Sequence, residues 1–406
     1  MIGFAVVVVP LTPNVMAADS DASVGPDIVT YEVYEPYLWG TVDQTTAYSV
    51  GTESCNRGDE PANWYSSSNL HPVIAQNLYR YKDGRLEQIG QSWLKHGFLS
   101  LNQDECDTCI YPPAGGSQLG VGCSDPYWAS LNGSQDRLGP RHEVNPFTGE
   151  FPDSHSTPVG NDTLRGRLLV DTADVDPTSN PGARFFAEGQ YVTSDEAAAG
   201  NSENSASYRE ESVSASLELT DVGPTFEGIP AIYAWAQVDP TASIREARVP
   251  SEGLFIVASA VQDNGDGTWR YQYGVYNLNS HRSAQSFTVP ILADAVITNT
   301  GFHDVDYHSG EPFDGTDWTV TVDNGAGVVT WATESFATNE NANALRWGTM
   351  YNFWFDADKE PTQDTATIGL FRDGTPATVQ TVVSSPSVDS LLFADGFETG
   401  DTGAWS

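Results

Sequence analysis

The chain has 406 residues, which is long for one compact core and favours two domains. It carries 55 acidic side chains against 18 lysines and arginines, a formal net charge of −37 at pH 7. A charge of this size repels nucleic acids and anionic membranes, and we exclude both classes as partners.

The first residues form an apolar run from Ile2 to Leu11, followed by small side chains. Val15 and Ala17 stand where a signal peptidase prefers small residues, so we predict a secretory signal peptide over residues 1–17. The run departs from the usual pattern because no lysine or arginine precedes it. No later stretch has the roughly 18 apolar residues that a membrane span requires. We therefore expect an exported protein, secreted or at the cell surface, with no membrane span.

The four cysteines all lie in the first third of the chain, at Cys55, Cys106, Cys109 and Cys123. Export favours two disulfides, whereas the Cys-x2-Cys spacing would also suit zinc. The tight turn between Cys106 and Cys109 disfavours a bond between those two. We expect each of them to pair with Cys55 or Cys123.

The predicted elements, in chain order, are short strands separated by turns, with no long helical periodicity. Residues 76–93 form a hairpin around Asp83-Gly84 within a loop-rich, disulfide-stapled β domain at 27–225. A second domain at 231–383 has strands spaced as in an immunoglobulin-like β-sandwich. Its predicted inward-facing side chains are Trp269, Tyr271, Tyr273, Val275, Phe287, Val289, Ile291, Trp318, Val320 and Val322.

Residues 384–406 form a polar linker and a short tail, "LFADGFETGDTGAWS". The tail resembles the endings of many exported Gram-negative bacterial proteins through Phe393, Asp395, Gly396, Phe397, Glu398, Gly400, Asp401, Trp405 and Ser406. That resemblance implies sorting or surface handling and no activity. Stretches such as "GVGCSDPY" and "NALRWGTMYNF" make the body similar to uncharacterised secreted bacterial proteins, which implies no catalytic residue.

The stretch "GFHDVDYHSG" at residues 301–310 is the strongest candidate for a metal site. In an extended strand, Asp304, Asp306 and His308 share one face at a spacing of about 6.6 Å. Their mixed oxygen and nitrogen ligands would suit zinc, manganese or calcium. The alternative is that Val305 and Tyr307 point into the core while the acids face water.

The remaining candidates are ligand-contact residues near the stapled loop. Rings in predicted loops could stack on sugar faces, and histidines there could reach a ligand or simply lie at hairpin ends. These candidates are Trp64, Tyr65, Tyr127, Trp128, His96, Arg141 and His142, with His71 and Asp125 nearby.

Two hypotheses of function follow. The first is a non-enzymatic surface or extracellular β-sandwich protein that binds a glycan or another cell-surface polymer. The alternative is a metal-dependent extracellular enzyme, a hydrolase or oxidase that uses Asp304, Asp306 and His308. We favour the first because the common hydrolase signatures are absent from the sequence.

Overall fold

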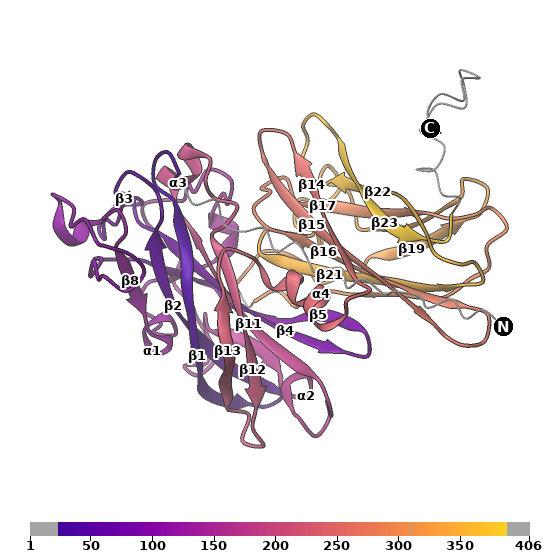
Figure 1. Cartoon of the computed structure of the whole chain (residues 1–406), viewed down its shortest axis with the longest axis horizontal. Helices are drawn as coiled ribbons and strands as arrows, with labels where there is room; N and C mark the ends of the chain where they lie inside the picture. Colours follow the sequence, from indigo (N-terminus) through magenta and orange to yellow (C-terminus); the bar gives the residue numbers. More distant parts are fainter. Residues whose placement is uncertain (1–22, 309, 388–406) are drawn as a thin grey trace, which may run out of the picture.

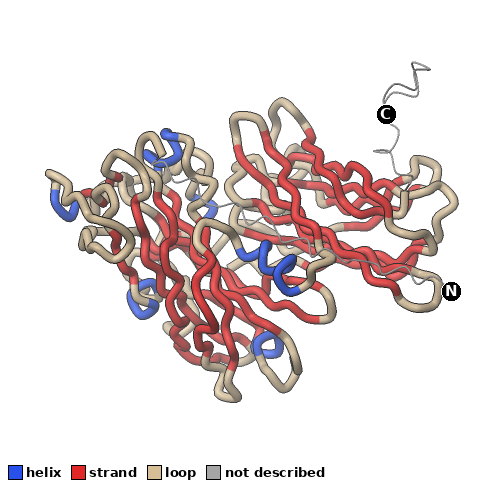
Figure 2. Tube along the Cα trace, in the orientation of Figure 1, coloured by secondary structure: helices blue, strands red, loops and turns tan. Residues whose placement is uncertain are grey.

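The computed structural model of the protein describes residues 23–308 and 310–387. Strands dominate this part of the chain and the helices are short, so the predicted all-β class is confirmed (Figure 2). The helices are η1 (Gly115–Ser117), α1 (Ala129–Asn132), η2 (Arg141–Glu143), α2 (Thr172–Val175), α3 (Ser194–Ala199), η3 (Ala231–Tyr233) and α4 (Ala234–Val238). None of these described helices has the length and apolar character needed to cross a bilayer. The predicted signal peptide and the C-terminal tail lie outside the described residues and stay predictions.

The N-terminal part is built on one antiparallel sheet of eleven strands, with the path β1-β2-β10-β5-β4-β11-β12-β13. The sheet curls until its first and last strands meet, because the Val33 amide on β1 donates to Thr225 Oγ1 on β13 at 3.0 Å. An apolar cluster that includes Val33, Tyr48 and Leu78 fills the curl. The strands of this part, with the small β3–β7 pair, are β1 (Ile28–Val42), β2 (Thr45–Asn56), β3 (Ala62–Asn63), β4 (Val73–Lys82), β5 (Arg85–Gln91), β6 (Leu94–His96), β7 (Gln118–Leu119), β8 (Ser124–Tyr127), β9 (Leu138–Gly139), β10 (Leu168–Asp171), β11 (Arg184–Val192), β12 (Ala206–Val213) and β13 (Leu219–Phe226).

The C-terminal part has two five-stranded antiparallel sheets, ordered β14-β15-β16-β21-β18 and β19-β20-β17-β22-β23 (Figure 1). Side chains of both sheets form one aromatic-rich core in which Phe353 contacts Phe287 and Trp331. Two sheets with a shared core occur in many β-sandwich folds, so immunoglobulin-like character stays a prediction. The strands are β14 (Ser243–Val249), β15 (Gly253–Asp263), β16 (Trp269–Asn277), β17 (Ala284–Pro290), β18 (Ile297–His303), β19 (Thr319–Asp323), β20 (Val328–Ala332), β21 (Thr349–Ala357), β22 (Thr362–Leu370) and β23 (Thr378–Ser385).

The two parts share a second apolar cluster. On β15, Phe255 and Val257 face the sandwich core, while Leu254 and Ile256 pack in a cluster with Tyr79 and other side chains of the N-terminal sheet. Alternation along the strand therefore buries both of its faces. The domain limits at 27–225 and 231–383 stay a prediction, since this packing joins the two parts.

Most of the predicted turns and faces agree with the structure. Asp83 and Gly84 connect β4 to β5 with φ of 52° and 80°, the left-handed geometry that a two-residue hairpin turn requires. Val322 differs, because β19 is an edge strand and the Val322 side chain is exposed rather than inward. The cysteines form Cys55–Cys106 and Cys109–Cys123 disulfides, which is one of the two pairings that the sequence left open.

Candidate functional site

The metal hypothesis rested on an extended strand that does not exist at the required residues. Strand β18 ends at His303, and residues 304–308 have no regular secondary structure. Asp304 Oδ2 accepts a hydrogen bond from Asn343 Nδ2 at 2.5 Å, and His308 is buried near Trp93. In the described part of the chain, no three His, Cys, Asp or Glu side chains are grouped closely enough to hold a metal ion. Residues 304–308 therefore belong to no strand, and the metal site stays a prediction that this geometry does not favour.

These residues instead line a polar cavity of about 430 Å³ between the two parts of the molecule. Gln88 and Gln91 on β5 form the opposite wall, and Gln91 Nε2 donates to the Asp306 carbonyl at 2.8 Å. Burial raises the pKa of Asp304 to about 6. The cavity therefore has a hydrogen-bonding, acidic lining with no lysine or arginine among its lining residues.

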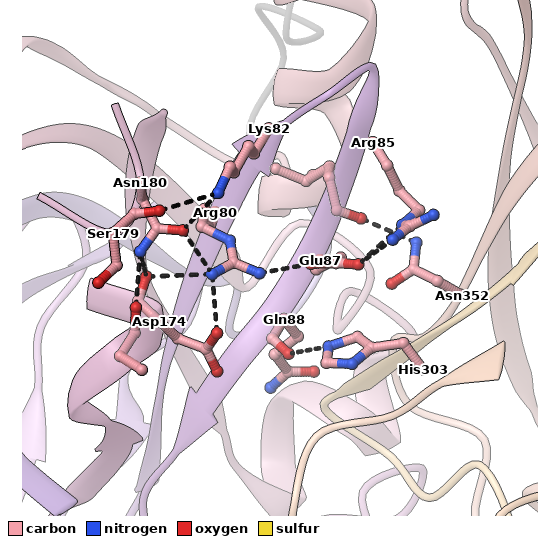
Figure 3. A network of polar contacts seen from close by, with 12 residues as sticks. Arg80, Lys82, Arg85, Glu87, Gln88, Asp174, Ser179, Asn180, His303 and Asn352 are labelled. Carbon is pink, nitrogen blue, oxygen red and sulfur yellow. Dashed lines mark hydrogen bonds and ion pairs between the residues drawn. The ribbon is translucent and has the colours of Figure 1, made fainter. Parts of the chain in front are cut away.

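A charged network flanks this cavity (Figure 3). Arg80 donates to Glu87 at 2.8 Å and to Asp174 at 2.7 Å, and His303 Nε2 lies 3.2 Å from the Gln88 carbonyl oxygen. Burial favours a higher pKa for Glu87, but His303, Arg85 and Arg80 outweigh it and lower the pKa to about 2. Glu87 is thus an ionised partner that holds the two arginines in place.

Two of the predicted histidines, His71 and His96, are buried rather than exposed at hairpin ends. His71 Nε2 lies 3.1 Å from His96 Nδ1, and the His96 ring stacks on His155 at a centroid distance of 3.9 Å. Burial lowers the pKa of His71 to about 4 and that of His96 to about 2. Both imidazoles are therefore neutral at pH 7. Their packing with Phe151 is that of core residues.

Arg141 and His142 separate into two roles. The buried Arg141 guanidinium donates to the carbonyls of Ser92, Gln76 and Gly348, so it fastens the N-terminal sheet to the β21 region. His142 is more exposed and its Nδ1 lies 2.8 Å from Glu311 Oε2. The hydrogen bond to Glu311 raises the pKa of His142.

The four predicted loop aromatics divide into core and surface residues. Trp64 and Tyr127 have 0% and 1% exposure, so the prediction that they are loop rings open to a ligand is wrong. Tyr127 lies on β8, and the Trp64 indole donates to the buried Asp125 carboxylate at 3.0 Å. Tyr65 and Trp128 are exposed, Trp128 by 56%.

Trp128 belongs to an exposed aromatic strip formed with Tyr34, Tyr37 and Trp39 of β1. The Trp128 and Tyr34 ring centroids are 4.8 Å apart, as are those of Tyr37 and Trp39. Tyr37 is 50% exposed, whereas the inward neighbour Leu38 packs against the apolar core of the curled sheet. The strip is therefore the outward face of β1, extended by the residue that precedes α1.

Two small residues of β2 position the strip. Ser49 Oγ accepts from Trp39 Nε1 at 2.8 Å and donates to the Ala129 carbonyl at 2.6 Å, so it ties Trp39 to the turn that carries Trp128. At Gly51, a Cβ would lie 2.9 Å from both the Ala129 nitrogen and Tyr34 Cβ. Only glycine at that position lets α1 approach β1 closely enough for Trp128 to stack on Tyr34.

The Trp39 ring is covered on one side by a cation. The Arg167 guanidinium carbon lies 3.4 Å from the Trp39 ring centroid, and Arg167 Nε donates to the Gly133 carbonyl at 2.9 Å. This contact leaves the two exposed rings, Tyr37 and Trp128, as the accessible ends of the strip. Sequence reasoning missed Tyr34, Tyr37 and Trp39, although "YEVYEPYLWG" carries an aromatic density that could have marked this strand.

Comparison with known proteins adds little. No protein-family model matches the chain, and no curated protein matches it. Among solved structures, a serine-rich repeat adhesion glycoprotein of Streptococcus agalactiae aligns over 87% of this chain and 96% of its own, with 10% identity and a TM-score of 0.21. The N-terminal domain of a Streptococcus gordonii adhesin aligns over 91% and 99%, with 8% identity and a TM-score of 0.21. TM-scores this low define no common fold, and we draw no functional conclusion from these likenesses.

Proposed function

We propose that the protein is an exported, non-enzymatic surface or extracellular protein that binds a neutral carbohydrate polymer on the aromatic strip. The observation that carries this proposal is the pair of exposed rings, Trp128 and Tyr37, held in place by Tyr34, Trp39 and Ser49. The apolar C–H face of a sugar ring packs on an aromatic ring, while its hydroxyls stay in water. Exposed clustered apolar side chains mark interaction sites on monomeric proteins.

Charge restricts the class of polymer. The net charge of −37 opposes the approach of an anionic polysaccharide, and Glu35 is an exposed acid beside the strip on β1. A neutral glycan is free of that penalty. The two disulfides suit an oxidising, extracellular location, which supports export.

The proposal is tested by affinity electrophoresis of the protein in gels that contain neutral polysaccharides of different backbone, such as β-glucan, xylan and mannan. We expect retardation in at least one of them, and Trp128→Ala should weaken binding about tenfold, which corresponds to about 1.4 kcal/mol. Tyr111→Ala is the matched control, because Tyr111 is 65% exposed but lies on the stapled loop rather than on the strip. No retardation by any polymer, or equal retardation of Trp128→Ala, would refute the proposal.

A second copy of the chain is the competing occupant of the strip. Light scattering across a protein concentration series distinguishes glycan binding from self-association. A strip that binds only glycan predicts the molar mass of a monomer at every protein concentration. A dimer that Trp128→Ala dissociates would assign the strip to self-association instead.

A further inference from the structure

A second cavity lies between the two parts of the molecule, apart from the aromatic strip, and its lining is rich in arginine. Its volume is about 20 Å³. We call it the arginine cavity; the ionisable side chains on its wall, apart from Tyr307, are Arg141, Arg346, Arg372, His142, His281 and Glu311. Phe313 and Trp347 contribute apolar surface to the same wall.

The cavity lining is positively charged, whereas the molecule as a whole is strongly negative. The chain has 18 lysines and arginines for 55 acids, yet three arginines meet here around one carboxylate. Glu311 already accepts hydrogen bonds from the Arg141 amide at 2.7 Å and contacts His142 at 2.8 Å. Among the described residues, the Arg141, Arg346 and Arg372 side chains form no ion pair with a carboxylate. A buried positive charge is costly without a compensating anion.

Of the three arginines, Arg346 most clearly lacks partners for its guanidinium group. It is 5% exposed, and its guanidinium carbon lies 4.0 Å from the Phe313 ring centroid and 4.6 Å from that of Phe371. Its Nη2 donates to the carbonyls of Glu340 and Ala342, at 3.0 and 3.1 Å.

Ring stacking satisfies the faces of a guanidinium and leaves its N–H edges to other partners. Apart from the Tyr307 hydroxyl, which interacts with the Arg346 side chain, the Nε and Nη1 atoms of Arg346 have no hydrogen-bond partner in the described part of the chain. Burial lowers the pKa of Arg346, and Tyr307, Tyr351 and Glu311 offset only part of that effect.

The size of the cavity restricts what could supply the missing charge. A volume of about 20 Å³ admits only a small group and is too little for a sugar ring or a nucleotide. A carboxylate is a small planar anion whose oxygens accept from guanidinium N–H groups. The rest of the molecule that carries it would lie outside, at the exposed His142 and the half-buried Phe313.

We propose that the arginine cavity binds the carboxylate of a small organic acid, with Arg346 and Arg372 as the two charges that receive it. Arg372 is half-buried, and its Nε donates to the His281 carbonyl at 2.9 Å, which holds the guanidinium at the cavity wall. This site is independent of the aromatic strip and of the neutral polymer proposed there.

His281 provides an internal reporter of occupancy. Burial, with Arg372 and Arg346, lowers the pKa of this imidazole to about 4. A carboxylate bound between the two arginines offsets their charge, so the His281 pKa should move back toward its ordinary value and its NMR signals should shift.

The test is isothermal titration of the whole protein with galacturonate, acetate, galactose and sulfate. We expect galacturonate to bind and galactose, its neutral counterpart, not to bind. Acetate binding as tightly as galacturonate would identify a free carboxylate as sufficient, whereas galacturonate alone would identify an acidic sugar. Binding of none of the four, or sulfate binding more tightly than either carboxylate, would overturn the proposal.

Variants connect that binding to the cavity. Arg372→Gln should weaken the binding of galacturonate at least tenfold and remove the shift of the His281 NMR signals. Arg346→Lys keeps the positive charge but loses the planar set of guanidinium donors. Arg245→Gln is the control, because Arg245 is exposed and away from the cavity. Should Arg346→Lys fail to fold, the half-buried Arg372 still decides the outcome. Trp128→Ala must leave carboxylate binding unchanged, so failure of one proposal does not carry over to the other.

Discussion

The N-terminal and C-terminal parts of the molecule are both β-structures, yet they bury different chemistry. The N-terminal part buries ionisable groups such as Lys95, His96, Glu188 and Glu211, some of them inside the curled sheet and some, like Glu188, where it contacts the C-terminal part. The C-terminal sandwich encloses a nearly continuous aromatic cluster around Phe353. Because buried polar groups need specific partners whereas aromatic rings need only contact, the first part depends on its hydrogen bonds and disulfides and the second on packing.

Glu188 illustrates the N-terminal pattern. The carboxylate is fully buried and accepts from Asn77 at 2.8 Å, from Tyr79 at 3.0 Å and from the Ala231 amide at 2.6 Å. Burial raises its pKa despite these bonds. The comparison therefore predicts that pH and reduction act on the N-terminal part, while truncation of rings acts on the C-terminal part.

The largest effect should come from Phe353→Ala. The Phe353 ring lies 5.0 Å from Phe287 and 5.4 Å from Trp331 by centroid, and its removal leaves a cavity in the sandwich core. We expect a loss of about 3–5 kcal/mol in the free energy of unfolding, measured by urea denaturation. Val322→Ala, at an exposed position on the edge strand β19, should cost little. A loss below about 1 kcal/mol for Phe353→Ala would contradict the packing argument.

Removal of the disulfides should come next and should separate the two bonds. Cys55–Cys106 spans 51 residues and Cys109–Cys123 spans 14. Loop-closure entropy then predicts losses of about 4 and about 3 kcal/mol for the paired serine variants. Differential scanning calorimetry measures both losses. A reducing agent should lower the stability of the wild-type protein to that of the variant that lacks both disulfides. Free thiols in the unfolded, unreduced protein would contradict the pairing.

A pH effect of similar or smaller size should come from His71. Its folded pKa of about 4 lies below the ordinary 6.5, so the unfolded chain binds more protons between these values. Stability should fall as pH drops from about 6.5 to about 4, by at most about 3.5 kcal/mol at about 1.4 kcal/mol per pH unit. The difference between wild type and His71→Gln reports His71 with its coupling to His96 and His155, while titrations elsewhere in the chain cancel. A difference that is constant with pH would refute the neutral buried histidine.

Glu211 should act in the opposite direction and serves as the companion test. Burial, with the like negative charge of Asp221, raises the pKa of Glu211 to about 9, so the folded protein holds a proton that the unfolded chain releases near pH 4.5. Stability from this group is present below pH 4.5 and is lost as pH rises toward 9. Glu211→Gln should remove this loss of stability with rising pH and leave the loss of stability at acid pH that is due to His71. Thermal denaturation at a series of pH values measures both.

The smallest effect is expected at the 304–308 segment. Since these side chains do not converge on one point, a chelator should leave the melting temperature unchanged, and Asp306→Ala should behave likewise. Stoichiometric zinc, manganese or calcium that Asp306→Ala releases would restore the metal-dependent alternative. A bound ion at a hundredfold excess over Kd would stabilise by about 2.7 kcal/mol, well within detection.

The sequence by itself determined the features that depend on local chemistry. Alternation predicted the strands and the inward rings of the sandwich, Asp83-Gly84 predicted its hairpin, and cysteine number with export predicted the disulfides. Each follows from neighbours in the chain or from a small set of pairings.

The tertiary structure alone decided what lies beside what. A strand end at His303 removed the periodicity on which the metal hypothesis depended, and long-range packing buried Trp64 and Tyr127 while leaving Trp128 exposed. The strip joins Trp128 to rings of β1 that are some 90 residues away in the chain, and the arginine cavity joins Arg141 to Arg346 across the two parts. Such contacts depend on how sheets curl and dock, which is set by the sum of many weak interactions rather than by any local pattern.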